Sequence, residues 1–497
     1  MQSHGTTRAD ERRVRSLQTS NLQNDGPSHA GPNTPRSYAP RDPEACLLTC
    51  LLRDHLDDFI ARCDDENHRP LPRFVQRQLR AITTCGDLGH GFVRLECNRC
   101  RGPRVVPFSC KVRLCPSCAG RRMNEQAAHL LDRVLPHVPY RQWVLTLPGE
   151  LARVVAFDAD LATAIFGVFA DEVGRWQRER ADKGGFAAAE TGCLLEIQRF
   201  ADGARLYPHA HALVPDGVFV AGADGQPVRF IRQDPPSDED VAHVVSRVEH
   251  RLTRVLGRWR ARVSMDSDDD DILPACADVP PTELVRLLGH NQGHERRPAP
   301  KKPLCARSPG GLELHAEVTI VAHDRKGLER LCRYLSRPPI PQDRLERRAD
   351  GKYVLSLKRT WKGGVKAVVF EPLDLIARLA ALVPAPYLAL RRFHGVFAPH
   401  HHLRARIVPT PSADSAVPAI PLAPERPGRM RWADLLMRVW AIDALKCPHC
   451  GGRMRPIAAI HAPDAITAIL AAVQSDKWSV RATGPPDPDR QLVLDAA

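Results

Sequence analysis

The sequence predicts an α+β protein, in which helices pack on an antiparallel sheet beside a small N-terminal zinc-ribbon domain. Three observations point to this class. Short apolar runs with strand-like alternation are interspersed with longer amphipathic runs. Cysteines are concentrated between Cys85 and Cys118. The length of 497 residues exceeds what one hydrophobic core usually organises, so we expect two or more domains.

Composition favours a nucleic-acid partner. The formal net charge is +13, which predicts binding to a polyanion. No apolar run is long enough to span a membrane, the N-terminus has no signal-peptide core, and no P-loop motif occurs, so we expect neither a membrane partner nor a nucleotide cofactor. The expected location is the cytoplasm. Disulfides are rare in that compartment, so the fifteen cysteines point to metal instead.

The N-terminal part divides in two. Residues 1–45 are rich in Ser, Pro, Gly and Arg and are predicted to be a disordered basic arm. Residues 46–135 are predicted to form a helical, zinc-binding and DNA-binding domain. Helical patterns there flank the cysteines, and the last of these helices is expected over 120–135.

Two CxxC knuckles in this domain give a zinc-ribbon pattern. Four thiolates on two tight turns can complete a tetrahedral Zn²⁺ site. The knuckle cysteines are Cys97, Cys100, Cys115 and Cys118. Cys110 lies between the knuckles and is a further candidate ligand, whereas Cys85 and His90 are either surplus or ligands of a second ion. Basic residues around the cluster are candidates for contacts with DNA phosphates; they include Arg113, Arg121 and Arg122.

Residues 136–372 are predicted to form the catalytic domain, with an insertion at about 221–313. The alternating runs predict strands, and Asp324 is the expected N-cap of a helix that Pro338 and Pro339 end. The strands are expected at 142–148, 193–200, 209–220 and 314–322, and a charged helix at 239–263.

The C-terminal region is predicted to be helical over residues 373–472, followed by a tail at 473–497. It contains a second knuckle, Cys447-Pro-His-Cys450. No second CxxC lies nearby, so His449 and His461 are the local candidates to complete a second zinc site. Whether these residues form a complete four-ligand site stays undecided at this point.

Two motifs suggest catalysis. His209 and His211 are two residues apart in a predicted strand, so their imidazoles share a face and can chelate one ion. The neighbouring strand offers Glu196 or Gln198 as a third ligand. Tyr334 ends a predicted helix between Arg333 and Arg337. A metal that polarises a phosphodiester, a tyrosine that attacks it and arginines that neutralise the developing charge would together form a nuclease. The predicted catalytic residues are therefore Tyr334, Arg333 and Arg337, and the predicted metal ligands are His209, His211 and Gln198.

Long motifs run through most of the chain, from about Phe74 to about Ile460. They are FSCK with CPSCAGRRM, then RQWVLTLP, QRF before YPHAHALVPDGVF, AHDRKGLERLCRYLSRPP, LIARLAALVPAP, RRFHGVFAPH and VWAIDALKCPHCGGRMRPIAAI. In these motifs the chain resembles the rolling-circle insertion-sequence transposases of type ninety-one. Some relatives carry a second tyrosine four residues before the one equivalent to Tyr334, where this chain has Arg330. The chain therefore resembles the single-tyrosine, common-region subgroup.

The resemblance implies a ferredoxin-like HUH endonuclease domain with an N-terminal transposase zinc-binding domain. It also implies nicking and rejoining of single-stranded DNA at element ends through a 5′-phosphotyrosine, with structural Zn²⁺ and catalytic Mg²⁺ or Mn²⁺. Two alternatives stay open at this point: a plasmid-type rolling-circle replication initiator, and a non-catalytic zinc-dependent DNA-binding protein from a decayed element.

Overall fold

A computed structural model describes residues 42–67, 70–222, 226–265, 302–361, 363–409 and 431–475. The basic arm predicted for 1–45 falls mainly on 1–41, which lie outside the described residues, as does most of the tail predicted for 473–497. Among the described helices, none is both long and apolar enough to cross a membrane.

The largest sheet has seven strands, and the pairs that form it are antiparallel. The strand order is β14-β4-β5-β3-β9-β8, and β10 also pairs with β3. The strands are β3 (Tyr140–Thr146), β4 (Gly192–Ala201), β5 (Arg205–Pro215), β8 (Cys305–Arg307), β9 (Glu313–His315), β10 (Thr319–Ile320) and β14 (Arg391–Gly395). The central order β4-β5-β3-β9 is that of a ferredoxin-like sheet, so the predicted fold class is confirmed.

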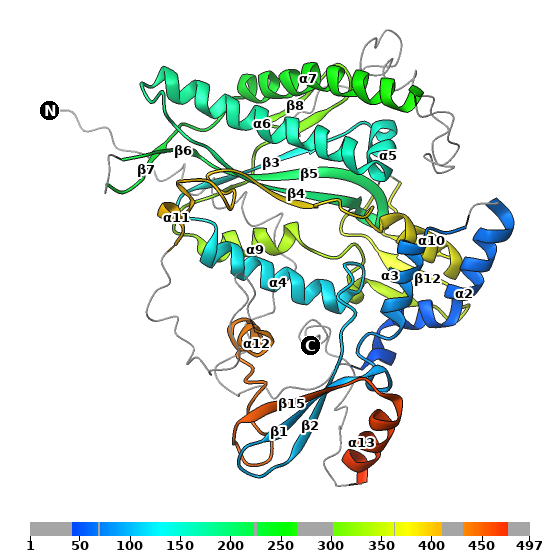
Figure 1. Cartoon of the computed structure of the whole chain (residues 1–497). Coiled ribbons are helices and arrows are strands. Elements are labelled where there is room, and N and C mark those ends of the chain that lie inside the picture. Colours follow the sequence, from blue (N-terminus) through cyan, green and yellow to red (C-terminus); the bar gives the residue numbers. More distant parts are fainter. Residues whose placement is uncertain are drawn as a thin grey trace.

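One face of this sheet carries α5 (Gly149–Phe157), α6 (Ala159–Lys183) and α7 (Asp238–Met265), as Figure 1 shows. Trp143 of β3 packs edge-on against Trp176 of α6, with 5.3 Å between ring centroids. Ala210 and Ala212 of β5 face the same core and are fully buried. Alternation along β5 therefore turns His209 and His211 to the opposite face.

The opposite face is covered by α4 (Pro116–Arg133) and α9 (Arg325–Leu335), which also contact each other (Figure 1). The predicted N-cap of α9 is confirmed, because the Asp324 carboxylate accepts a hydrogen bond from the Gly327 amide at 2.7 Å. Leu194 and Leu213 of the sheet pack with Leu331 and Leu335 of α9. This apolar contact holds the end of α9 over the β4–β5 pair.

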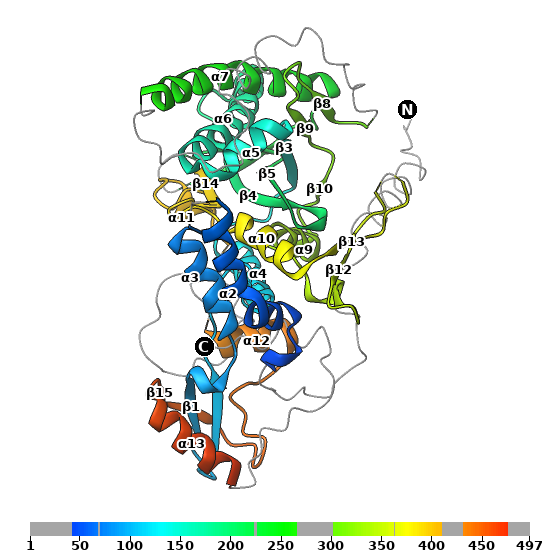
Figure 2. The same ribbon diagram turned by 90° about the vertical axis from the view of Figure 1, so that its right-hand side faces the viewer.

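A second core lies beside the sheet, where α2 (Leu47–Asn67) packs on α3 (Arg73–Thr83) and α10 (Pro372–Leu382), as Figure 2 shows. A three-stranded sheet joins this core and consists of β11 (Leu345–Arg347), β12 (Tyr353–Ser356) and β13 (Ala367–Phe370). The remaining short elements are β6 (Gly217–Val220), β7 (Arg229–Arg232), α11 (Arg404–Ile407) and the 3-10 turns η1 (Pro43–Ala45), η2 (Leu88–His90), η3 (Asp202–Ala204) and η4 (Gln342–Arg344).

A separate three-stranded sheet combines both ends of the described chain. Its order is β15-β1-β2 (Figure 1). The strands are β1 (Phe92–Cys97), β2 (Pro103–Pro107) and β15 (Met454–Ile460), with α12 (Trp432–Trp440) and α13 (Pro463–Ser475) beside them.

The structure differs from two predicted boundaries. The range 221–313 was predicted to be an insertion, but α7 and β8, which fall within it, belong to the main domain. The apolar face of α7 packs on α6, and β8 extends the sheet. Residues 266–301 lie outside the described residues. The range 373–472 predicted as one C-terminal region is divided, because α10 packs on α2, β14 joins the main sheet and β15 joins β1.

Candidate active site and cysteine clusters

Two histidines and a glutamine meet on the face of the sheet beneath α9. In the β4–β5 register, Gln198 pairs with His209 and Glu196 pairs with His211. Directly paired residues of antiparallel strands project to the same side, so these four side chains form one polar patch. The rings of His209 and His211 have centroids 4.9 Å apart. The strand periodicity therefore brings together the side chains that the sequence predicted would meet.

Hydrogen bonds fix the orientation of both rings. The Nδ1–H of His209 donates to the carbonyl oxygen of Tyr207 at 2.9 Å. The side-chain amide of Gln142, on β3, lies 2.9 Å from Nδ1 of His211. The Tyr207 carbonyl thus fixes the proton of His209 on Nδ1, which leaves Nε2 as the atom for a ligand. Nε2 of His211 is equally available when the Gln142 amide presents its oxygen to Nδ1, because Nδ1 then carries the proton. Buried without a hydrogen-bond partner are Nε2 of His211 and Oε1 of Gln198.

Burial keeps both histidines neutral. It lowers the pKa of His209 to about 4, and the positive charge of Arg337 acts in the same direction. Burial also lowers the pKa of His211 well below its ordinary value, with smaller contributions from His209 and Arg337. Neutral imidazole is the form that coordinates a metal, so the environment favours the ligand form at neutral pH.

Tyr334 occupies the last turn of α9, directly above the histidines. Its ring is perpendicular to that of His211, at 87°, with centroids 6.2 Å apart. The guanidinium carbon of Arg337 lies 3.9 Å from the centroid of the Tyr334 ring, and Nζ of Lys358 lies 5.2 Å from it. The amide of Gln198 donates to the carbonyls of Tyr334 and Leu335, at 3.1 and 3.0 Å. Gln198 therefore fastens the tyrosine turn to the histidine strand.

The two arginines that flank Tyr334 differ in their surroundings. Arg337 lies over the tyrosine ring, and its Nη1 is buried without a hydrogen-bond partner. Arg333 instead pairs with Glu329 one turn earlier on α9, at 2.5 Å. The geometry thus brings Arg337 to the tyrosine ring and engages Arg333 along the helix.

Glu196 is engaged by a cation that sequence reasoning did not find. The Nε of Arg391, on β14, donates to the Glu196 carboxylate at 2.6 Å, and its Nη2 donates to Ser336 at 2.5 Å. Burial raises the pKa of Glu196, which this ion pair opposes. Of the two candidates for a third ligand, Glu196 is thus occupied by Arg391, whereas Gln198 has a free oxygen.

A pocket opens beside this patch. Arg113 and Arg122 line it together with Gln198, Ser336 and Arg337, whereas Arg121 lies outside. Burial lowers the pKa of Arg113 to about 10, so its guanidinium remains charged at neutral pH. The pocket can therefore accept an anion beside Leu335 and Ser336, the residues that follow Tyr334 in the chain.

Two other tyrosines of the C-terminal half have surroundings that differ from those of Tyr334. Tyr353 is fully buried in the core around α2, and Tyr387 is fully exposed to solvent. Neither has the contacts with histidine that distinguish Tyr334.

Cysteines form two clusters of four. Within each cluster, the sulfurs all lie within 4.8 Å of one another. The first cluster contains Cys85, Cys110, Cys115 and Cys118, and the second contains Cys97, Cys100, Cys447 and Cys450. The two N-terminal knuckles that we predicted to share one zinc are therefore separated, because β1 and β2 carry the knuckle at Cys97 towards β15 and away from α4.

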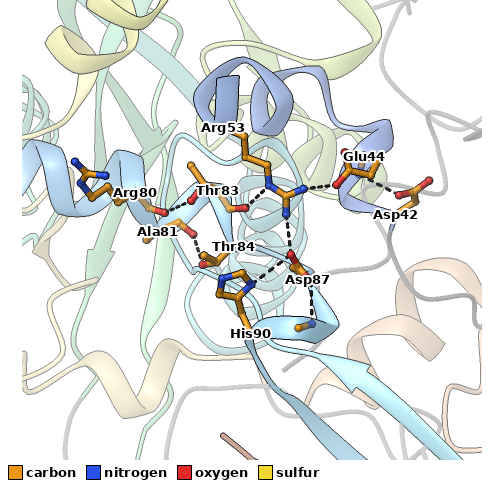
Figure 3. A network of polar contacts seen from close by, with 10 residues as sticks. Asp42, Glu44, Arg53, Arg80, Ala81, Thr83, Thr84, Asp87 and His90 are labelled. Atoms are coloured by element: carbon orange, nitrogen blue, oxygen red, sulfur yellow. Dashed lines mark hydrogen bonds and ion pairs between the residues drawn. The ribbon is translucent and has the colours of Figure 1, made fainter. Parts of the chain in front are cut away.

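The predicted histidine alternatives lie outside both clusters. His90 pairs with Asp87, at 3.3 Å, in a network that also joins Arg53 of α2 to Asp87 (Figure 3). His461 stacks on Phe108, with centroids 4.6 Å apart. His449 lies in the second knuckle but is not one of its four clustered ligands.

Comparisons with known proteins match two separate parts of the chain. Residues 51–147 match the family described as "Transposase zinc-binding domain", and residues 192–405 match the family described as "Putative transposase". A relative from Pseudomonas savastanoi pv. phaseolicola, "Transposase for insertion sequence element IS801", is 23% identical over 384 residues, which is 76% of this chain and 79% of the relative. No solved structure matches the chain.

Proposed function

The chain belongs to the insertion-sequence transposases of type ninety-one, and from this premise we propose that it nicks and rejoins single-stranded DNA with Tyr334 as the nucleophile. The observation that carries the proposal is the position of Tyr334 over two neutral histidines, 6.2 Å from the buried His211 between ring centroids. A tyrosine that only packed its ring would need neither these histidines nor Arg337.

The polar patch fits a divalent metal. His209 and His211 offer ring nitrogens, and the free oxygen of Gln198 supplies a third donor. When bound to the two histidines and Gln198, Mg²⁺ or Mn²⁺ would act as a Lewis acid that polarises the scissile phosphate. The buried and unpartnered atoms of His211 and Gln198 support this assignment, because such atoms are costly unless a ligand satisfies them.

The proposed reaction is a transfer of the phosphoryl group to tyrosine. The Tyr334 oxygen forms a bond to phosphorus, the bond from phosphorus to the 3′ oxygen breaks, and the phenolic proton passes to the departing oxygen. The products are a 5′-phosphotyrosine and a free 3′-hydroxyl. Arg337 and Lys358, both close to the Tyr334 ring, would neutralise charge on the phosphoryl oxygens.

Rejoining is the reverse reaction, in which a 3′-hydroxyl attacks the phosphotyrosine. The phosphodiester energy is retained in that linkage, so no nucleotide cofactor is required. Arg330 lies one turn before Tyr334 on α9 and is exposed, where some relatives have a second tyrosine. We therefore propose one tyrosine nucleophile per chain.

The zinc-binding domain is proposed to hold the strand and to complete the active-site pocket. Cys85, Cys110, Cys115 and Cys118 suit a structural Zn²⁺, because sulfur separations of 3.5–3.7 Å are close to the value of about 3.8 Å in a tetrahedral thiolate site. The loop between Cys110 and Cys115 carries Arg113, which lines the pocket. Zinc there would fix Arg113 at this pocket, where it can bind a phosphate of the DNA.

The transposase families match the chain over both the zinc-binding and the tyrosine-bearing segments, which favours transposition over plasmid replication as the biological role. We accordingly propose the ends of the insertion sequence as the DNA substrate. The polar patch beneath Tyr334, with its candidate metal ligands, favours an enzyme over a protein that only binds DNA.

A nicking assay tests the proposal. Wild-type protein should cut a single-stranded element-end oligonucleotide only when Mg²⁺ or Mn²⁺ is present. His211→Ala and Tyr334→Phe should each abolish cutting and still bind the oligonucleotide, because neither change removes a basic residue. Tyr387→Phe is the matched control and should cut normally, since Tyr387 is fully exposed. Normal cutting by either site variant would refute the assignment.

A further inference from the structure

The second cysteine cluster lies outside the proposed active site. We propose that Cys97, Cys100, Cys447 and Cys450 bind a second Zn²⁺ in a ribbon assembled from β1, β2 and β15. This ion would fasten the C-terminal segment 431–475 to the N-terminal zinc-binding domain. The cysteines come from two knuckles that are at least 347 residues apart in sequence, the separation between Cys100 and Cys447.

The sulfur geometry suits a metal rather than disulfides. The separation is 3.5 Å between Cys97 and Cys450 and 3.7 Å between Cys100 and Cys447. A tetrahedral site with zinc–sulfur bonds of about 2.3 Å places its sulfurs about 3.8 Å apart, whereas a disulfide needs about 2.05 Å. All four cysteines are free thiols.

The two knuckles have the same backbone turn. In the first, the amide of Arg101 donates to the Cys97 carbonyl at 3.1 Å, and the Cys97 amide donates to Gly102 at 3.0 Å. In the second, the corresponding bonds run from Gly451 to Cys447 at 3.0 Å and from Cys447 to Gly452 at 2.7 Å. The residue after each second cysteine has positive φ, 60° at Arg101 and 70° at Gly451. Positive φ is uncommon for an arginine. Because both knuckles have a residue with positive φ at the equivalent position, we infer that the two turns serve the same purpose.

Backbone amides also point at the sulfurs. The amide of Arg99 donates to Cys97 Sγ at 3.4 Å, and that of Gly452 donates to Cys450 Sγ at 3.4 Å. Such bonds favour the thiolate form that a metal requires. A side chain at Gly452 would place its Cβ 3.0 Å from Cys97 Sγ, so the close approach of the two knuckles requires glycine at this position.

Strand pairing brings the knuckles together, and the stacked rings of Phe108 and His461 and the hydrogen bond from Arg104 to the Ala444 carbonyl add to it. Strand β15 pairs with β1, with Cys97 opposite Met454, and Asn98 exchanges hydrogen bonds with Arg453 at 2.9 and 3.0 Å. The core of the unit contains few large apolar side chains, among them Leu95, Leu436 and Met454. A small core of this kind commonly relies on a structural metal. Zinc would therefore strengthen the attachment of the C-terminal segment.

Metal analysis of the full-length protein tests the proposal directly. Wild type should contain two Zn²⁺ per chain, whereas a Cys447→Ser/Cys450→Ser variant should contain one. A Cys305→Ser control should keep two, because Cys305 belongs to neither cluster. One Zn²⁺ in the wild type, or two in the double variant, would overturn the second site.

Hydrogen exchange tests the fastening separately. In the Cys447→Ser/Cys450→Ser variant, peptides from β15 should lose protection while those from β4 and β5 keep it. Retained protection of β15 after loss of one ion would refute the fastening. If the double variant does not fold, Co²⁺-substituted wild type decides the matter, since two tetrathiolate sites should give twice the thiolate charge-transfer absorption per chain of one site. This outcome does not depend on Tyr334 or on nicking.

Discussion

Gln198 has two proposed roles, metal ligand and anchor of the tyrosine turn, that substitution can separate. Its oxygen is buried without a hydrogen-bond partner, and its amide nitrogen donates to the carbonyls of Tyr334 and Leu335. Gln198→Glu keeps an oxygen ligand but loses both donated hydrogen bonds. Gln198→Leu, which is similar in size, loses the ligand and both bonds. The two variants should therefore share a loss of stability and differ in metal affinity.

The loss of stability follows from the two hydrogen bonds. Each hydrogen bond contributes about 1 kcal/mol net, so the loss is about 2 kcal/mol. In a domain of roughly 150–250 residues, 1 kcal/mol shifts the midpoint by about 2–4 °C, which gives a fall of about 4–8 °C for either variant. A carboxylate at Gln198→Glu would also face two carbonyl oxygens, so that variant should lie at the upper end of the range.

Calorimetric titration with Mn²⁺ and thermal unfolding in chelator measure the two effects. Gln198→Glu should bind Mn²⁺ at least as tightly as wild type, whereas Gln198→Leu should bind at least tenfold more weakly. Equal Mn²⁺ affinity in Gln198→Leu and wild type would refute Gln198 as the third ligand. An unchanged midpoint in both variants would refute its role in anchoring the tyrosine turn.

Acid should destabilise the metal-free protein. Burial lowers the pKa of His209 from 6.5 to about 4, so the unfolded chain binds more protons than the folded chain between these values, and stability falls as pH drops through that window. Thermal midpoints in chelator at pH 7 and pH 5 measure the effect, and His209→Gln should reduce the difference; an equal difference would argue against a buried neutral imidazole. Arg113→Ala should weaken binding to single strands of any sequence and reduce the slope of log affinity against log salt by about 0.7, whereas an unchanged slope would mean that Arg113 contacts no phosphate.

Local periodicity predicted the catalytic side of the site. The alternation of β5 put both histidines on one face, and the helix signals from Asp324 to Pro338 put Tyr334 at a helix end. These features depend on neighbours within a few residues, so a single sequence carries them. That the histidines and Tyr334 would meet came from the resemblance and from chemical plausibility rather than from periodicity.

Contacts between segments far apart in the sequence could not be predicted from local patterns. CxxC spacing identifies a knuckle but not its partner, and the partner of Cys97 and Cys100 is fixed by the pairing of β1 with β15. Lys358 reaches Tyr334 because its amide donates to Asp202 at 2.9 Å, in the turn between β4 and β5. Neither contact leaves a local sequence signal, because both depend on how distant segments pack.

In the proposed reaction, Tyr334 becomes covalently linked to DNA. Mass spectrometry of protein digested after reaction with a single-stranded element-end oligonucleotide and Mn²⁺ tests it most directly. We expect a nucleotide-bearing peptide that contains Tyr334 and no adduct in Tyr334→Phe. An adduct on Tyr353 or Tyr387, or one that persists in Tyr334→Phe, would contradict it.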